Sequence, residues 1–213
     1  VKKASLVKHD WYKRIGHSKK CMNEIRLKLD VHSDEDIDNE IETLKMSERE
    51  YQKVEINYSS FYYYGDDVKE VIKLFSSSIV ELTCDDCENF DIDLPNLKKL
   101  GLYFLSLTKF EDSFKENGLM EKFTNLEELK VFADSSSRYH DESDEQWHHK
   151  QIGKFIDLLS LNTNLKSLTF NDVNIFEAQH KEKIKKLTFQ LKKLTMSCIS
   201  FRGEVDYDCF EDF

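Results

Sequence analysis

Proline, glycine and long apolar runs are scarce in this chain. Its 213 residues include one proline and six glycines, too few for the many tight turns of a loop-rich β-sandwich. No apolar run approaches the ~20 residues that a membrane-spanning helix needs, and the chain does not open with the apolar segment of a signal peptide. We therefore expect regular elements joined by polar connections, and no membrane partner.

The sequence motifs of common enzymes are also missing. None of the patterns GxSxG, HExxH, GxGxxG or the phosphate-binding P-loop occurs. Acid pairs such as Asp85–Asp86 have no companion base or nucleophile at motif spacing, and paired carboxylates serve an enzyme only in a cleft that shifts one pKa. We expect no catalytic residue, no metal and no cofactor, so the chain is predicted not to be an enzyme.

Basic charge is outnumbered, with 31 Lys and Arg against 41 Asp and Glu and a net charge of −10. Binding to nucleic acid thus has no global electrostatic support, and no nucleic-acid partner is predicted. Residues 1–30 nevertheless hold nine basic residues against three acidic ones. Either these form a solvated helix face, or they bind RNA or an acidic partner with steep salt dependence.

The five cysteines are odd in number and scattered, which favours a reducing compartment, cytoplasmic or nuclear. Cys84 and Cys87 have the spacing of a metal or redox pair, but no second pair stands at zinc-finger spacing. His148 and His149, near His140, are a second candidate metal site. Adjacent histidines on a helix point about 100° apart, so a solvated junction is favoured there.

A nine-position pattern recurs along the chain, with apolar residues at positions one, four and six. Seven segments fit it, and their residues at positions one, four, six and nine are Met22–Ile25–Leu27–Asp30, Tyr51–Val54–Ile56–Ser59, Ile79–Leu82–Cys84–Cys87, Leu97–Leu100–Leu102–Leu105, Leu126–Leu129–Val131–Asp134, Leu165–Leu168–Phe170–Val173 and Leu191–Leu194–Met196–Ile199. The pattern resembles the leucine-rich-repeat signature, although only Cys87 matches the usual Asn or Cys at position nine. The resemblance implies an α/β solenoid, a horseshoe of about seven parallel strands on the concave face with helices and loops on the convex face.

Alternation along a strand turns positions four and six inward, and positions three, five and seven outward. Position three carries Glu24, Lys53, Glu81, Lys99, Glu128, Ser167 and Lys193. Neighbouring strands would thus set opposite charges side by side almost throughout, and each such pair contributes a few tenths of a kcal/mol. This row predicts both the register and a strand order that follows the chain.

The segments between the strands have helical periodicity. Apolar residues at i, i+3, i+4 and i+7 predict helices over 68–75 and 152–159, and a capping box at Ser33 predicts another over 37–44. A weaker helical stretch covers 181–187. The polar segment 134–150 predicts a loop, and the short step between Ile79 and Leu97 leaves room only for a turn. The repeat domain is placed at 21–203 and an acidic C-terminal tail at 204–213.

Residues 1–20 do not fit the repeat. Their apolar side chains predict an amphipathic helix: Ala4, Leu6, Val7, Trp11, Tyr12 and Ile15. Five positions resemble the end of an F-box: Ser5, Leu6, Val7, Trp11 and Tyr12. Lys8 departs from that ending, where Cys is usual. The resemblance implies an F-box/leucine-rich-repeat protein, the substrate receptor of a cullin-type ubiquitin ligase, with a Skp adaptor and cullin complex as partners if the full F-box lies upstream. The alternative is a plain N-terminal cap on the solenoid.

A protein partner is expected on the concave face, where the outward positions lie. Tyr103 and Phe132 would be neighbours in the middle of the array, with lysines beside them. The predicted partner-binding residues are Lys99, Tyr103, Lys130, Phe132, Thr169 and Asn171. The alternative is that the two aromatic rings only cover each other across adjacent strands. The function predicted from the sequence is therefore a protein-interaction scaffold, either the substrate-recognition part of an F-box receptor or a free-standing binding module with no ubiquitin role.

Overall fold

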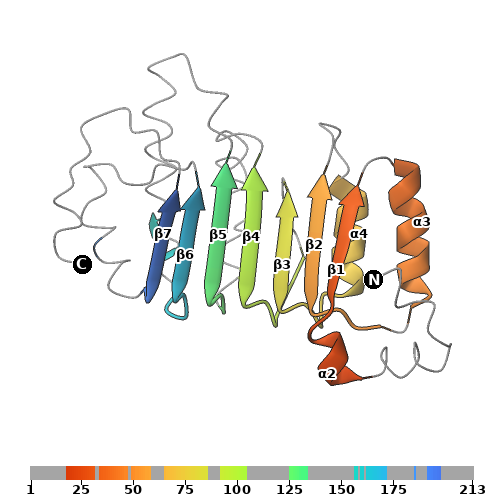
Figure 1. Ribbon diagram of the computed structural model, residues 1–213, viewed down its shortest axis with the longest axis horizontal. Coiled ribbons are helices and arrows are strands. Elements are labelled where there is room, and N and C mark those ends of the chain that lie inside the picture. The colour runs from red at the N-terminus through yellow and green to blue at the C-terminus, as the bar shows by residue number, and fades with distance from the viewer. Residues whose placement is uncertain are drawn as a thin grey trace, which may run out of the picture.

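In the computed structural model the strands of the chain form one open sheet (Figure 1). The described residues are 18–31, 34–47, 49–58, 65–85, 92–104, 125–133, 156–157, 159–160, 162–171, 185 and 191–197. Within them the sheet has seven strands: β1 (Arg26–Val31), β2 (Lys53–Tyr58), β3 (Glu81–Asp85), β4 (Lys99–Phe104), β5 (Glu128–Ala133), β6 (Ser167–Asn171) and β7 (Lys193–Ser197). All neighbours pair in parallel and in chain order, so the predicted α/β class, strand direction and strand order are confirmed.

The labelled helices within the described residues lie towards the N-terminal end of the sheet. They are α2 (Lys19–Met22), α3 (Asp34–Lys45) and α4 (Gly65–Leu74), and Figure 1 shows α4 behind β1 and β2. The helix expected over 37–44 is thus confirmed as part of α3, and the one expected over 68–75 is confirmed within α4 except for Phe75, which follows the helix. Of the helix expected over 152–159, the described residues include helical Ile156 and buried Leu159. The rest of that helix, most of 181–187, the loop at 134–150 and both chain ends lie outside the described residues.

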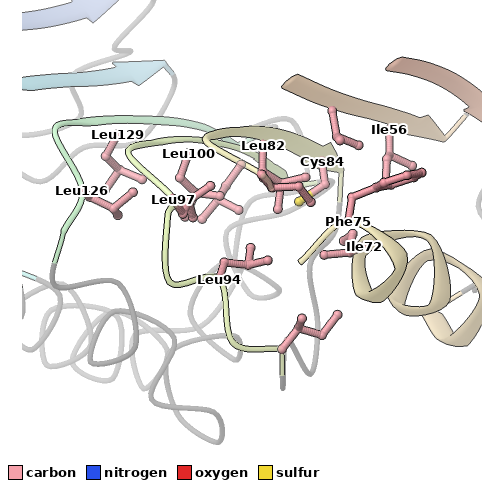
Figure 2. Close-up of a cluster of buried hydrophobic side chains, with 14 of the residues drawn as sticks. Ile56, Ile72, Phe75, Leu82, Cys84, Leu94, Leu97, Leu100, Leu126 and Leu129 are labelled. Atoms are coloured by element: carbon pink, nitrogen blue, oxygen red, sulfur yellow. The ribbon is translucent and has the colours of Figure 1, made fainter. Parts of the chain in front are cut away.

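The inward positions form a continuous buried layer. From β2 to β6 the residues at positions four and six are at most 2% exposed: Val54, Ile56, Leu82, Cys84, Leu100, Leu102, Leu129, Val131, Leu168 and Phe170. Fully burying one such side chain contributes about 1.5–3 kcal/mol, so the layer is the main source of stability. Figure 2 shows part of this layer, together with Ile72 and Phe75, which lie in and just after α4; the labelled members of the layer are Ile56, Leu82, Cys84, Leu100 and Leu129.

Position one forms a second buried row before the strands begin. Leu97, Leu126 and Leu165 are each no more than 1% exposed. Tyr51 packs its ring edge-on against Phe75, with the ring centroids 5.2 Å apart. Ile79 is also fully buried. The position-one residues therefore close the core beneath the strand starts, as the repeat pattern predicts.

A repeated hydrogen-bond arrangement marks the start of each strand from β3 to β7. One carbonyl oxygen accepts the backbone N–H groups of two successive residues in the next segment. The acceptors are Gln52, Val80, Lys98, Glu127 and Lys166, with N···O distances of 2.7–3.1 Å. Because each shared carbonyl fixes two consecutive amides, it aligns the next strand before its regular ladder begins.

The register predicted for β1 was wrong by two residues, whereas every later register was correct. Arg26, not Glu24, pairs with Lys53, and Lys28 pairs with Glu55. A two-residue shift keeps every side chain on its original face, so burial periodicity alone does not choose between the two registers. The observed register places Lys28 beside Glu55 and buries Leu29, which is 4% exposed, against the β2 side of the core.

Between β3 and β4 the chain makes a turn at Pro95–Asn96 and no helix among the described residues 92–98, as the short step predicts. Asn96 Nδ2 donates to the backbone oxygen of Ser77 at 2.8 Å. Ile92 and Leu94 are buried beneath the turn. This side-chain contact ties the turn to the segment that precedes β3.

Cys84 is fully buried in β3, which confirms its predicted core position. It is disulfide-bonded, and its partner lies outside the described residues, as does Cys87. Cys21 is free and exposed. The spacing of the cysteines did not predict a disulfide.

Candidate protein-binding surface

The outward face of the sheet, made of positions three, five and seven, is the candidate site. In the observed register its rows begin with Arg26, Lys28 and Asp30 on β1 and cross all the strands. The opposite face is occupied by the buried layer. The outward face is thus the side of the sheet on which side chains reach the solvent.

Tyr103 and Phe132 meet at the centre of this face. Their Cα atoms are register partners on β4 and β5, and the rings stack with centroids 4.3 Å apart and planes 3° from parallel. Tyr103 is still 39% exposed, while Phe132 is half-buried. The rings therefore cover one face of each other, as the alternative interpretation requires, but leave aromatic surface open to a partner.

Lys130, one outward position before Phe132, and Lys99, two outward positions before Tyr103, share one counter-ion. Glu128 lies 3.4 Å from Lys99 Nζ and 3.0 Å from Lys130 Nζ. Partial burial opposes ionisation of Glu128, but the two ammonium groups outweigh it, and its pKa is lowered. Glu128 thus remains a carboxylate that holds two half-exposed lysines in the outward rows that precede the aromatic pair.

The Tyr103 hydroxyl lies in a mixed electrostatic environment. Burial raises its pKa first, and the carboxylate of Asp85 raises it further, while Lys130 opposes the change. The phenol therefore stays neutral and can donate a hydrogen bond at any physiological pH. The neutral hydroxyl at the end of the exposed Tyr103 ring can donate a hydrogen bond to a carbonyl or carboxylate oxygen of a partner.

Thr169 continues the face on β6, where it pairs in register with Lys130 and is half-buried. The backbone of Asn171 pairs with Phe132, and the side chain of Asn171 is not among those the structure describes. Gly101 lies between Thr83 and Lys130 in the row below the stack. A Cβ at Gly101 would meet Thr83 Oγ1 at 3.0 Å, so the neighbouring threonine already fills the space that a side chain there would need.

The part of the face on β1–β3 is instead filled by an ionic network. The predicted Glu24–Lys53 ion pair forms at 3.5 Å, but the contacts of Arg26 were not predicted from the sequence. Arg26 donates to Glu55 at 2.8 Å and also to Glu81, two strands away. The hydrogen bond to Glu55 is the main reason that the pKa of Arg26 is raised, and the pKa of Glu55 is correspondingly lowered. The signal that could have found it was the run of opposite charges in the outward rows, once β1 is placed in its observed register.

Lys28 and Asn57 extend the same network. Lys28 Nζ lies 3.4 Å from Glu55 and 3.6 Å from Asp30. Asn57 Nδ2 donates to Asp30 at 2.9 Å and to Glu55 at 3.4 Å. The acidic groups Asp30 and Glu55 are thereby each held by more than one neighbour.

A second charged row follows position two at the strand starts. Glu127 accepts from Lys166 at 2.9 Å and pairs with Lys98 at 3.0 Å. Hydrogen bonds from Lys166 and Lys98 lower the pKa of Glu127 to about 2. This row links the starts of three successive strands, β4, β5 and β6, by ion pairs. It is separate from the aromatic pair.

Several candidate residues lie outside the described residues. They are Cys87, the histidines at 140 and 148–149, and the F-box-like positions Ser5, Leu6, Val7, Trp11 and Tyr12. Over the part of the chain that is described, no three His, Cys, Asp or Glu side chains gather as a metal site. No helix in that same part has the length and apolar character needed to cross a membrane.

Comparison of the chain with protein-family models, with curated proteins and with solved structures gives no match in any of the three. The functional argument therefore depends on the geometry of the outward face and on the sequence.

Proposed function

We propose that the chain is a protein-binding module of leucine-rich-repeat type, whose outward face captures a partner protein. The observation that carries this proposal is the stacked Tyr103–Phe132 pair, exposed at the centre of a polar sheet face. Aromatic side chains are enriched among residues that dominate binding energy at interfaces. An open sheet face supports extended contact better than it supports a buried reaction centre, so binding is favoured over catalysis.

The horseshoe arrangement is part of the same proposal. Its support is a sheet in strict chain order, with shared carbonyl acceptors at the starts of β3 to β7 and a buried leucine at position one before several strands. Each unit of such an array contacts mainly its neighbours in the chain, and the accumulated strands present one long surface. A partner on this surface could therefore contact several repeats at once.

The test removes the aromatic pair and keeps the fold. The variant Tyr103→Ala/Phe132→Ala should capture at least tenfold less partner from cell extract, as quantified by mass spectrometry, because truncation of central aromatic anchors weakens binding strongly. Its matched control is Met46→Ala/Leu74→Ala, which removes exposed apolar side chains at the ends of α3 and α4. Equal capture by wild type and both variants, with circular dichroism showing that all are folded, would remove the proposal.

The more specific role that we propose is substrate recognition for an F-box-type ubiquitin ligase. Its support is the resemblance of residues 5–12 to the end of an F-box, placed directly before the repeats. If the complete F-box lies upstream of Val1, Leu6→Ala/Trp11→Ala in that longer protein should abolish co-purification of the Skp adaptor while leaving partner capture intact. The captured partner should also become longer-lived in cells that carry this variant.

The alternative is a free-standing binding module. It predicts partner capture without any adaptor, and a partner lifetime that does not change.

We propose the cytoplasm or nucleus as the compartment on the basis of the cysteine pattern, although the disulfide at Cys84 is more typical of oxidising compartments. Thiol counting on protein purified under alkylating conditions tests this, because a reducing compartment leaves all five cysteines free.

A further inference from the structure

We propose that the partner segment is acidic, carries an aromatic residue, and lies over β4–β7 and not over β1–β3. This inference rests on the proposed function and specifies the chemistry of the ligand. It follows from a difference in charge between the two parts of the outward face.

The described outward side chains of β4–β7 are positive within an acidic protein. They include three lysines, Lys99, Lys130 and Lys193, against the single carboxylate of Glu128. The net charge of these groups is +2, whereas the whole chain carries −10. A local potential of opposite sign to the whole protein selects partners by charge and raises their rate of association.

Glu128 leaves much of this positive charge available. It is one carboxylate between two ammonium groups, and Lys99 and Lys130 are 51% and 50% exposed. Each ammonium group has three donors, so contact with Glu128 leaves donors for a second acceptor. Partner carboxylates can thus bind both lysines without displacing Glu128.

The β1–β3 part of the face has the opposite character. Its outward acids outnumber its outward bases: Asp30, Glu55, Glu81 and Asp85 against Arg26, Lys28 and Lys53. The basic groups already contact acids within the chain. An acidic segment that moved over β1–β3 would meet surplus negative charge, so repulsion confines it to β4–β7.

The aromatic pair supplies the anchor beyond one end of the lysine rows. Tyr103 and Phe132 lie one outward position beyond Gly101 and Lys130 on their strands, and Lys99 lies two outward positions from Tyr103. An aromatic side chain on the exposed ring of Tyr103 would put flanking carboxylates within reach of these lysines. Four strands spaced by about 4.8 Å extend roughly 15 Å between the outer two, which an extended segment of about five residues can span.

The experiment uses a fluorescein-labelled ten-residue peptide of alternating Glu and Asp with one central Trp, titrated with the full chain and followed by fluorescence anisotropy. The variant Lys99→Glu/Lys130→Glu should bind it at least tenfold more weakly, because attraction at both positions becomes repulsion. The matched control, Lys20→Glu/Lys73→Glu, makes the same charge change at exposed lysines of α2 and α4 and should bind within twofold of wild type. A peptide with Ser in place of Trp, and one with Lys in place of every acid, should both bind weakly.

Equal loss in the two lysine variants would overturn the inference, since the effect would then follow net charge alone. So would a wild-type chain that binds the basic peptide better. If Tyr103→Ala/Phe132→Ala loses partner capture but Lys99→Glu/Lys130→Glu does not, the proposed function stands and the acidic preference falls. If neither variant changes capture, both fall.

The chain's own segment 204–213 is a competing occupant, with five acids and no base. A full-length variant with Asn and Gln in place of those five acids separates the two sources. Peptide affinity within twofold of wild type supports a partner in trans. An affinity that appears only in this variant would show that the chain's own tail occupies the surface, which overturns the inference.

Discussion

The outward face differs in side-chain chemistry between its β1–β3 part and its β4–β7 part, although both lie on the same parallel sheet. On β1–β3 the exposed positions are long charged side chains that satisfy each other, centred on Glu55 with its contacts to Arg26 and Lys28. On β4–β7 the outward positions include a buried glycine, hydroxyl side chains, an aromatic pair and two lysines that share one glutamate. The backbone register is equally regular in both parts.

The difference shows that the sheet itself does not require either surface. The same buried rows run beneath both parts, so the fold is stabilised from the inner side. Groups that already have partners gain little from a new one, whereas an exposed ring and half-shared ammonium groups do gain. The side chains of the charged part on β1–β3 therefore mainly bind one another, whereas those of the aromatic part on β4–β7 can still bind a partner.

The largest expected effect would come from the shared core. Ile56→Ala in β2 and Phe170→Ala in β6 each remove a fully buried side chain, and each should cost about 3–5 kcal/mol of unfolding free energy, a little less for isoleucine. Urea denaturation followed by circular dichroism measures both. A loss below about 1 kcal/mol in either variant would contradict a common core beneath the two parts.

A smaller effect should separate the two parts of the face. Glu55→Gln keeps the shape of the side chain and removes the charge that holds Arg26 and Lys28, so it should cost about 1 kcal/mol. Lys130→Met on the aromatic part should cost less than about 0.5 kcal/mol, because Lys130 has one shared partner. Equal destabilisation of the two variants in thermal melts would break the comparison.

The smallest effect concerns the charged row at the strand starts. The folded pKa of Glu127, about 2, lies below the ordinary glutamate value of about 4.3. Its contribution is therefore fully present above pH ~4.3 and is lost as pH falls towards 2. Carbon-detected NMR titration should place its pKa in that low range, and Lys98→Met/Lys166→Met should return it towards 4.3. An unchanged low value in this double variant would exclude the two lysines as the cause.

Much of the fold could be predicted because the same pattern of buried positions recurs in every segment. Leu97, Leu126 and Leu165 stand at the same position of successive segments, and alternation then fixes which side chains are buried. The meeting of Tyr103 and Phe132 followed directly from that register. Their parallel stacking did not, because ring orientation depends on side-chain packing across strands.

The wrong register of β1 and the missed disulfide arise where the apolar pattern fits more than one arrangement of the chain. At β1 a two-residue shift preserves the apolar face, so the choice depends on side chains that reach across strands, such as Arg26 to Glu81. The Cys84 disulfide depends on spatial proximity, which cysteine spacing along the chain does not give. These are long-range interactions, and a local pattern carries little information about them.

The strict chain order of the strands has a mechanical consequence. Each strand pairs with its neighbour in sequence, so even the widest step of the charged row, from Glu127 to Lys166, spans only 39 residues. In a sheet of parallel neighbours, tension applied between β1 and β7 would load the edge strands first. We expect single-molecule pulling to peel strands from an edge in successive small extensions, each releasing about one repeat. Such stepwise yielding would let the molecule lose an end strand under load while the remaining strands stay paired.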